Sequence, residues 1–127
     1  MIESAVESNF LVAHRLHRYE RTCKEVYGHN FAVEVTISEK RLNKIGFGID
    51  FLDLKNDIDY FLKRFDHKNL NEFKTFKKIT PTSENMAIWP YDSLSEKINS
   101  KNIKIIKVKI KESPQFKANY YEEKKRQ

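Results

Sequence analysis

The stretch FAVEVTI, residues 31–37, alternates apolar side chains with smaller or polar ones. Its apolar members are Phe31, Val33, Val35 and Ile37. Side chains two residues apart in a strand point to the same face, so these four share one side of an extended chain. The alternation predicts a half-buried strand that contributes one apolar face to a core.

Three further strands are predicted around this one. Residues 2–14 alternate more weakly and predict a strand that ends at His14, followed by a polar loop over residues 15–27. Near the C-terminus, the apolar residues Ile106, Val108 and Ile110 alternate with lysines. This pattern indicates a strand with one solvent-exposed face. Residues 116–121 predict a fourth strand after a Ser-Pro turn.

Two helices are predicted between the second and third strands. Asp50 can cap the first, whose apolar residues recur at helical spacing: Leu54, Ile58, Phe61, Leu62 and Phe65. The second opens at residues 81–84, where hydroxyl side chains and an early acid suit a helix N-terminus. It runs to Ile98, and Pro90 inside it predicts a kink or a local break.

The order strand, strand, helix, helix, strand, strand predicts an α+β fold. We expect a four-stranded antiparallel sheet with two helices on one face. Residues 1–127 form one domain by length. Open sheet edges make the chain a candidate for a homo-oligomer joined through those edges.

Composition narrows the function classes. One cysteine excludes an internal disulfide and, with no signal peptide at the start of the chain, favours a cytoplasmic setting. No apolar run approaches the roughly 20 residues of a membrane helix. The net charge of +6 is spread among many acidic residues, so nucleic-acid binding is disfavoured. A small anionic substrate, such as a phosphate ester, suits the same modest positive field.

The positions of the histidines suggest a metal-binding site. Tyr27 and His29 lie two apart on one strand and share a face, and His14 ends the neighbouring strand. Catalytic zinc commonly takes three protein ligands and keeps a position open. Taken singly, such histidines are more often surface or core residues, and Cys23 alone is more often a small buried hydrophobe. An Asp66-His67 pair alone suits a helix C-terminus.

Six ordered motifs, taken together, resemble the 6-pyruvoyl-tetrahydropterin synthase and 6-carboxy-tetrahydropterin synthase family. Residues 10–14 resemble F-x-A-A-H, residues 23–29 resemble C-x-x-x-H-G-H, and residues 48–51 match the segment before the first helix. Residues 66–71 are similar to D-H-x-x-L-N, residues 81–85 match P-T-x-E-N, and residues 108–113 resemble V-x-V-x-E-T. The resemblance covers nearly the whole chain, from Phe10 to about Tyr120.

The resemblance implies a zinc-dependent lyase acting on 7,8-dihydroneopterin triphosphate. His14 and His29 would bind zinc, and Cys23, Asp66 and His67 would form the catalytic set. Zinc on a substrate hydroxyl makes the neighbouring C–H bond easier to deprotonate, and a nearby charge lowers a thiol pKa. The short spacer between Cys23 and Tyr27 is similar to the bacterial enzyme that makes 6-carboxy-5,6,7,8-tetrahydropterin for queuosine and other 7-deazaguanines.

The resemblance also implies a substrate pocket and an assembly. Glu112 would accept hydrogen bonds from the pterin edge, and Thr82 and Ser83 would sit in the same pocket. Family subunits have the tunnelling fold and oligomerise into a barrel, as trimers that stack into hexamers. Active sites in that assembly lie between subunits.

Tyr27 departs from the family pattern, because it replaces the first histidine of H-G-H. The phenol could ligate zinc, since the metal's charge lowers a pKa of about 10. His17 could supply the third ligand instead. The alternative functions are 6-pyruvoyl-tetrahydropterin synthase activity and a zinc-poor, non-catalytic pterin-binding protein.

Overall fold

The protein is described by a computed structural model over residues 1–14, 27–46, 48–66 and 68–123. For residues 12–14, 27–29 and 78 the description is of the backbone alone. Of the loop predicted at residues 15–27, residues 15–26 lie outside the described residues, as does His67, while Tyr27 already belongs to a strand.

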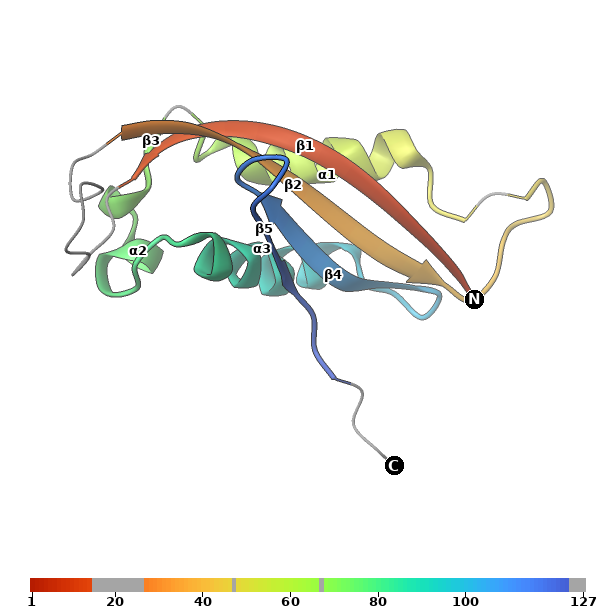
Figure 1. Ribbon diagram of the computed structural model, residues 1–127. Coiled ribbons are helices and arrows are strands. Elements are labelled where there is room, and N and C mark those ends of the chain that lie inside the picture. The colour runs from red at the N-terminus through yellow and green to blue at the C-terminus, as the bar shows by residue number, and fades with distance from the viewer. Residues whose placement is uncertain (15–26, 47, 67, 124–127) are drawn as a thin grey trace.

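Four antiparallel strands form the frame, as predicted (Figure 1). β1 (Ile2–His14) and β2 (Tyr27–Glu39) pair along their full lengths, from Ile2 opposite Glu39 to His14 opposite Tyr27. β4 (Ile103–Lys111) pairs with the other edge of β2, and β5 (Lys117–Tyr120) pairs with β4.

The structure adds a fifth, very short strand that the sequence did not predict. β3 (Lys68–Asn69) lies parallel to β1, and the sheet order is β3-β1-β2-β4-β5. The 3₁₀ turn η2 (Leu70–Glu72) and the short helix α2 (Lys74–Lys78) follow it. Elements of two to five residues are too short for a hydrophobic period to show, which is why the sequence did not indicate them.

Both predicted helices form, and they lie on one side of the sheet. α1 (Phe51–Lys63) begins after Asp50, whose side chain accepts from the Leu52 N–H at 2.8 Å. α3 (Ser83–Ile98) begins after Thr82, whose hydroxyl accepts from the Asn85 N–H at 3.1 Å. In Figure 1 the sheet passes in front of α1 and α3. Pro90 lies within the assigned span of α3, so the helix continues through it and is not broken there.

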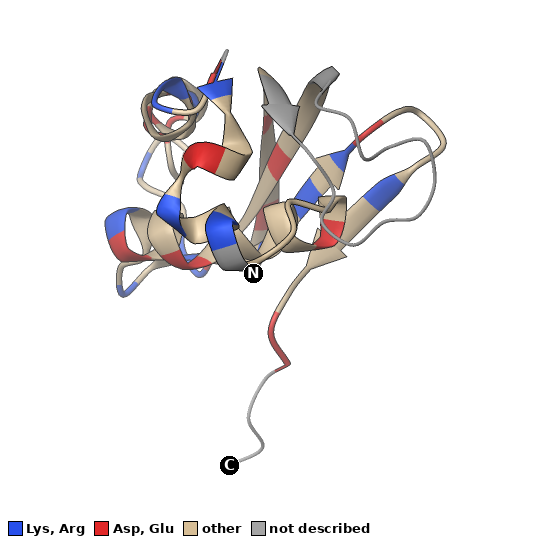
Figure 2. Ribbon diagram, turned by 90° about the vertical axis from the view of Figure 1, so that its left-hand side faces the viewer, with Lys and Arg blue, Asp and Glu red and all other residues tan. Residues whose placement is uncertain are grey.

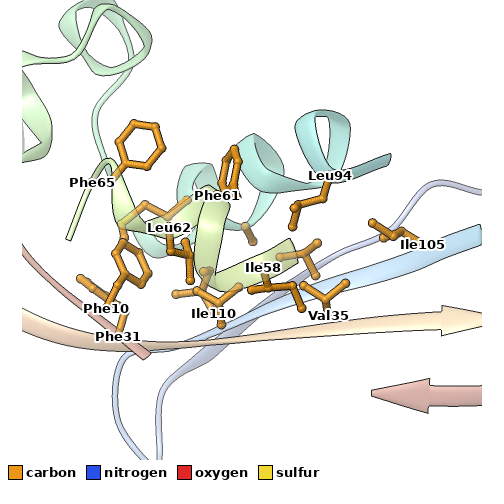
Figure 3. Close-up of a cluster of buried hydrophobic side chains, with 14 of the residues drawn as sticks. Phe10, Phe31, Val35, Ile58, Phe61, Leu62, Phe65, Leu94, Ile105 and Ile110 are labelled. Carbon is orange, nitrogen blue, oxygen red and sulfur yellow. The ribbon is translucent and has the colours of Figure 1, made fainter. Parts of the chain in front are cut away.

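The core fills the space between the helices and the sheet (Figure 3). Each of the four apolar residues of the FAVEVTI stretch is fully buried. They meet Leu54, Ile58, Phe61 and Leu62 of α1 and Met86 and Leu94 of α3, which are also buried. Burial of this apolar face is the main force that holds the helices on the sheet.

One detail of the predicted third strand is wrong. The alternation places Ile106 on the core side, but Ile105 is buried and Ile106 is only half-buried. The pairing of β2 with β4 shifts between Thr36 and Ile37, so that Ile37 stands opposite Ile105. Such an irregularity exchanges the faces of the residues beyond it, and sequence alternation carries no mark of it.

The face of the sheet opposite the helices carries charge. Lys111 bonds to Glu7 at 2.5 Å and to Glu34 at 3.2 Å, and Glu7 and Glu34 are direct cross-strand partners. Figure 2 shows acidic residues lying among the basic ones. Of the helices that the structure describes, none has both the length and the apolar character needed to cross a membrane.

Candidate active site

The strand register gathers the three predicted metal ligands at one end of the sheet. His14 stands directly opposite Tyr27, and Val12 stands opposite His29. Because faces alternate along each strand, the positions of His14, Tyr27 and His29 all fall on one face. The donor set at these positions is two imidazoles and a phenol, which are chemically suited to zinc.

Asp66 is attached to the same end of the sheet. Its Oδ1 accepts a hydrogen bond from the Leu11 N–H at 2.8 Å. Two residues later, β3 pairs with β1 at Val12 and Ala13. The segment that leads into His67 is therefore held against the strand that carries His14.

The predicted substrate residues line one pocket. Thr82 and Ser83, at the N-terminus of α3, and Glu112, after the end of β4, share a pocket of about 370 Å³. Its remaining walls are Glu84, Gln115, Phe116, Lys117 and Ala118. Residues about 30 positions apart in sequence thus face one space, as their proposed common role requires.

The metal positions and this pocket belong to the same end of the molecule. Lys111, at the end of β4, pairs with Ala32, near the start of β2. Glu112 also lines a second pocket of about 450 Å³ with Asn9 and Asn30, and Asn30 directly follows His29. The positions of Asn30 and His29 are neighbours on β2 and fall on opposite sides of the sheet, so Glu112 lies at the same end of the sheet as the histidine positions, while its second pocket is lined from the opposite face.

The pocket offers several groups that can accept hydrogen bonds from a ligand. Glu84 and Glu112 supply carboxylates, and Thr82 and Ser83 supply hydroxyls that both donate and accept. A carboxylate that accepts two parallel N–H groups fixes a flat ring in orientation as well as in place. The N-terminus of α3 adds a positive dipole end at the same place.

Several predicted residues lie outside this description. Cys23, His67 and the alternative ligand His17 are not among the described residues. The side chains of His14, Tyr27 and His29 are likewise not described. In the described remainder of the chain, no three His, Cys, Asp or Glu side chains group as a metal site would require.

Sequence reasoning missed four of the pocket's lining residues that carry polar or aromatic groups. Glu84 lies inside the quoted P-T-x-E-N motif, but an acidic residue there was expected only to stabilise the N-terminus of the helix. Gln115 and Phe116 belong to the turn between β4 and β5, and Lys117 begins β5; nothing in the composition of this short segment says which side chains face a pocket.

The protein is an α+β domain in which candidate metal ligands, hydroxyl groups and carboxylates gather at one end of the sheet. This arrangement is typical of an enzyme. Comparison with known proteins gives the family. Residues 3–123 match the family model described as 6-pyruvoyl tetrahydropterin synthase. The chain belongs to this family of pterin-converting enzymes.

Three relatives illustrate the range of the family. An Archaeoglobus fulgidus protein provisionally named 6-carboxy-5,6,7,8-tetrahydropterin synthase is 36% identical over 101 residues, covering 79% of this chain and 83% of that protein. The dihydroneopterin monophosphate aldolase of Pyrococcus furiosus is 34% identical over 73% of this chain and 75% of its own. The solved structure of Caenorhabditis elegans 6-pyruvoyl tetrahydropterin synthase superposes with a TM-score of 0.84, at 26% identity over 96% of each chain.

Proposed function

We propose that this protein is a zinc-dependent lyase that converts 7,8-dihydroneopterin triphosphate to 6-carboxy-5,6,7,8-tetrahydropterin. The observation that carries the proposal is the shared pocket of Thr82, Ser83 and Glu112. The A. fulgidus relative, named for the carboxy product, supports the choice of reaction. The short Cys23–Tyr27 spacer supports it as well, and favours 7-deazaguanine and queuosine synthesis as the use of the product.

Each residue of the candidate site has its own role in the proposed reaction. Glu112 accepts N–H groups of the pterin edge, while Thr82 and Ser83 hold the opposite polar atoms of the ring. His14, His29 and Tyr27 would hold zinc, which when bound acidifies C–H bonds beside the substrate hydroxyls. Cys23 removes one of these protons, and His67, next to the anchored Asp66, moves the second.

The assembly is part of the proposal. β5 is the last strand at one edge of the sheet and β3 covers only two residues of the other. Exposed strand edges favour pairing with another chain. We propose a trimer closed by such edge pairing into a barrel, and a hexamer made of two trimers, with active sites between subunits.

A second reaction is favoured by the P. furiosus relative, whose name gives a dihydroneopterin monophosphate aldolase. Retro-aldol cleavage begins by removing a proton from a side-chain hydroxyl rather than from a C–H bond, and a metal and a base placed beside that hydroxyl would serve it as well. The two reactions differ in substrate and in the pterin product. Formation of the 6-pyruvoyl product and a non-catalytic, zinc-poor pterin-binding role are two further candidate functions.

Product analysis separates these reactions. Zinc-loaded full-length protein is incubated with dihydroneopterin triphosphate and, separately, with the monophosphate, and products are identified by mass spectrometry. We expect 6-carboxytetrahydropterin and acetaldehyde from the triphosphate. Retro-aldol products from the monophosphate would assign the aldolase reaction instead. Consumption of neither substrate would refute catalysis and leave the binding role.

A further inference from the structure

Phe116 is an aromatic side chain in an otherwise polar pocket. Of the residues that line the pocket with Glu112, Phe116 and Ala118 alone are apolar. Phe116 is 66% exposed. Most aromatic side chains that the structure describes are packed instead, among them Phe10, Phe31 and Phe76, which are almost fully buried.

The turn that carries Phe116 is held by its own hydrogen bonds. The Phe116 carbonyl accepts from the Glu112 N–H at 2.9 Å and from the Ser113 N–H at 3.3 Å. The Ser113 hydroxyl in turn accepts from the Phe116 N–H at 3.1 Å. The backbones of Glu112 and Phe116 are therefore fixed to each other, and both side chains start from one closed turn.

Among the side chains that the structure describes, the ring of Phe116 packs against no other aromatic ring. Phe65 and Phe76, by contrast, each contact Trp89. An exposed apolar face costs free energy in water and is favoured where a ligand covers it. Beside two carboxylates, the ligand that uses both features is a flat heterocycle with N–H groups along its edge.

We propose that Phe116 is a specificity-determining residue that stacks on the flat ring of the substrate while Glu112 binds the ring's edge. The inference rests on the proposed function, because it assumes that this pocket takes a pterin. It assigns the turn between β4 and β5 to substrate selection. Stacking on an aromatic face is selective for planar rings and tolerant of the ring's side chain.

The test is the dissociation constant of neopterin, a soluble pterin without phosphates, for wild type and five variants of the full-length protein, Glu112→Gln among them. Phe116→Ala removes the ring, Phe116→Leu keeps apolar volume without a π face, and Phe116→Trp keeps the face. We expect binding to weaken about tenfold in the alanine and leucine variants and to stay near wild type in the tryptophan variant. The control, Phe51→Ala, removes an equally exposed phenylalanine (59%) at the start of α1 and should bind as wild type does.

The assembly is measured in the same samples by light scattering, because Phe116 directly precedes the edge strand β5. Wild-type affinity in Phe116→Ala would overturn the inference. A changed molar mass with unchanged affinity would overturn it too, by assigning the ring to a contact between subunits. Failure of wild-type protein to bind neopterin, or equal binding by Glu112→Gln, would instead refute the pterin pocket itself.

Discussion

Tyr27 is the residue that sets this chain apart from the motif it otherwise follows. Its place directly opposite His14 in the β1–β2 ladder puts it at a predicted ligand position, where the motif has histidine. A phenolate oxygen is a harder donor than an imidazole and must first lose a proton whose ordinary pKa is about 10. The proposed zinc site would therefore bind its metal with a stronger dependence on pH than a three-histidine site.

Zinc stoichiometry tests the role of Tyr27 directly. We expect untagged wild-type protein to hold close to one zinc per chain by elemental analysis. Tyr27→His should hold zinc at least as tightly, because a neutral imidazole binds without first losing a proton. Tyr27→Phe, which removes only the oxygen, should lose most of the metal.

The matched variant is His17→Ala. If His17 rather than Tyr27 completes the site, this variant loses zinc and Tyr27→Phe keeps it. Little zinc in wild type together with a full site in Tyr27→His would contradict zinc dependence in the natural protein and favour the binding role.

At the level of residues, short sequence motifs predicted part of the lining of the pocket, while the binding roles of those residues stay predictions. Thr82, Ser83 and Glu112 were predicted to share a pocket, and they line one together. Phe116 and Lys117 were not found, because their position depends on how the turn after β4 closes against α3. That closure is a matter of three-dimensional packing and leaves no period in the sequence.

At the level of elements, the segment before α1 depends on a close approach that only glycine permits. Glu39, at the end of β2, is 2% exposed, and its Oε1 accepts from the Ile49 N–H at 2.9 Å. A Cβ on Gly48 would lie 1.5 Å from the other carboxylate oxygen of Glu39. The glycine therefore lets the chain pass over a buried carboxylate that ties β2 to the start of α1.

Gly48→Ala should destabilise the protein by about 1–3 kcal/mol in the free energy of unfolding, the usual cost of overpacking a buried site. Urea denaturation measures it. In a double-mutant cycle with Glu39→Ala, the two changes should be strongly non-additive, because removing the carboxylate removes the clash.

Gly46→Ala is the control for this cycle. Gly46 has a φ of 88°, and a Cβ added to it would meet no other atom within 4 Å, so the cost of alanine comes from the backbone conformation alone. Glu39→Ala should leave that cost unchanged. If Glu39→Ala reduced the destabilisation by alanine equally at Gly46 and Gly48, the steric explanation for Gly48 would be contradicted.

Element prediction succeeded where a period or a cap marked the chain. Asp50 and Thr82 cap the two long helices as expected, and the alternating strand over residues 31–37 forms the centre of the sheet. β3 was missed because two residues carry no alternation. Ile106 was misplaced because pairing with β2, rather than alternation within β4, decides which isoleucine enters the core.

At the scale of the whole molecule, charge on the open face of the sheet joins three strands. Lys111 of β4 bonds to Glu34 of β2 and to Glu7 of β1, and these hydrogen bonds raise the pKa of Lys111 above its ordinary value of 10.5. A lysine whose pKa is raised on folding stabilises the fold below its unfolded pKa. That stabilisation is lost as pH rises through the folded value.

Lys111→Met should lower stability at about pH 8 by up to about 1 kcal/mol, since the pairs are partly in water and their loss leaves two opposed glutamates. The difference from wild type should shrink as pH rises above 10.5 and through the higher pKa of Lys111 in the folded protein. Urea unfolding across this range of pH measures the difference in stability.

Lys104→Met, on the same strand but exposed, is the control and should give a small difference that does not vary with pH. A Lys111→Met difference that persists unchanged above the folded pKa would contradict an electrostatic role.

The most direct measurement of the central claim is a crystal structure of the protein with neopterin bound. The account predicts the pterin ring in the pocket of Thr82, Ser83 and Glu112, with the Glu112 carboxylate accepting two N–H groups of the ring. A ring bound elsewhere, or bound in this pocket with Glu112 turned away from its N–H edge, would contradict it.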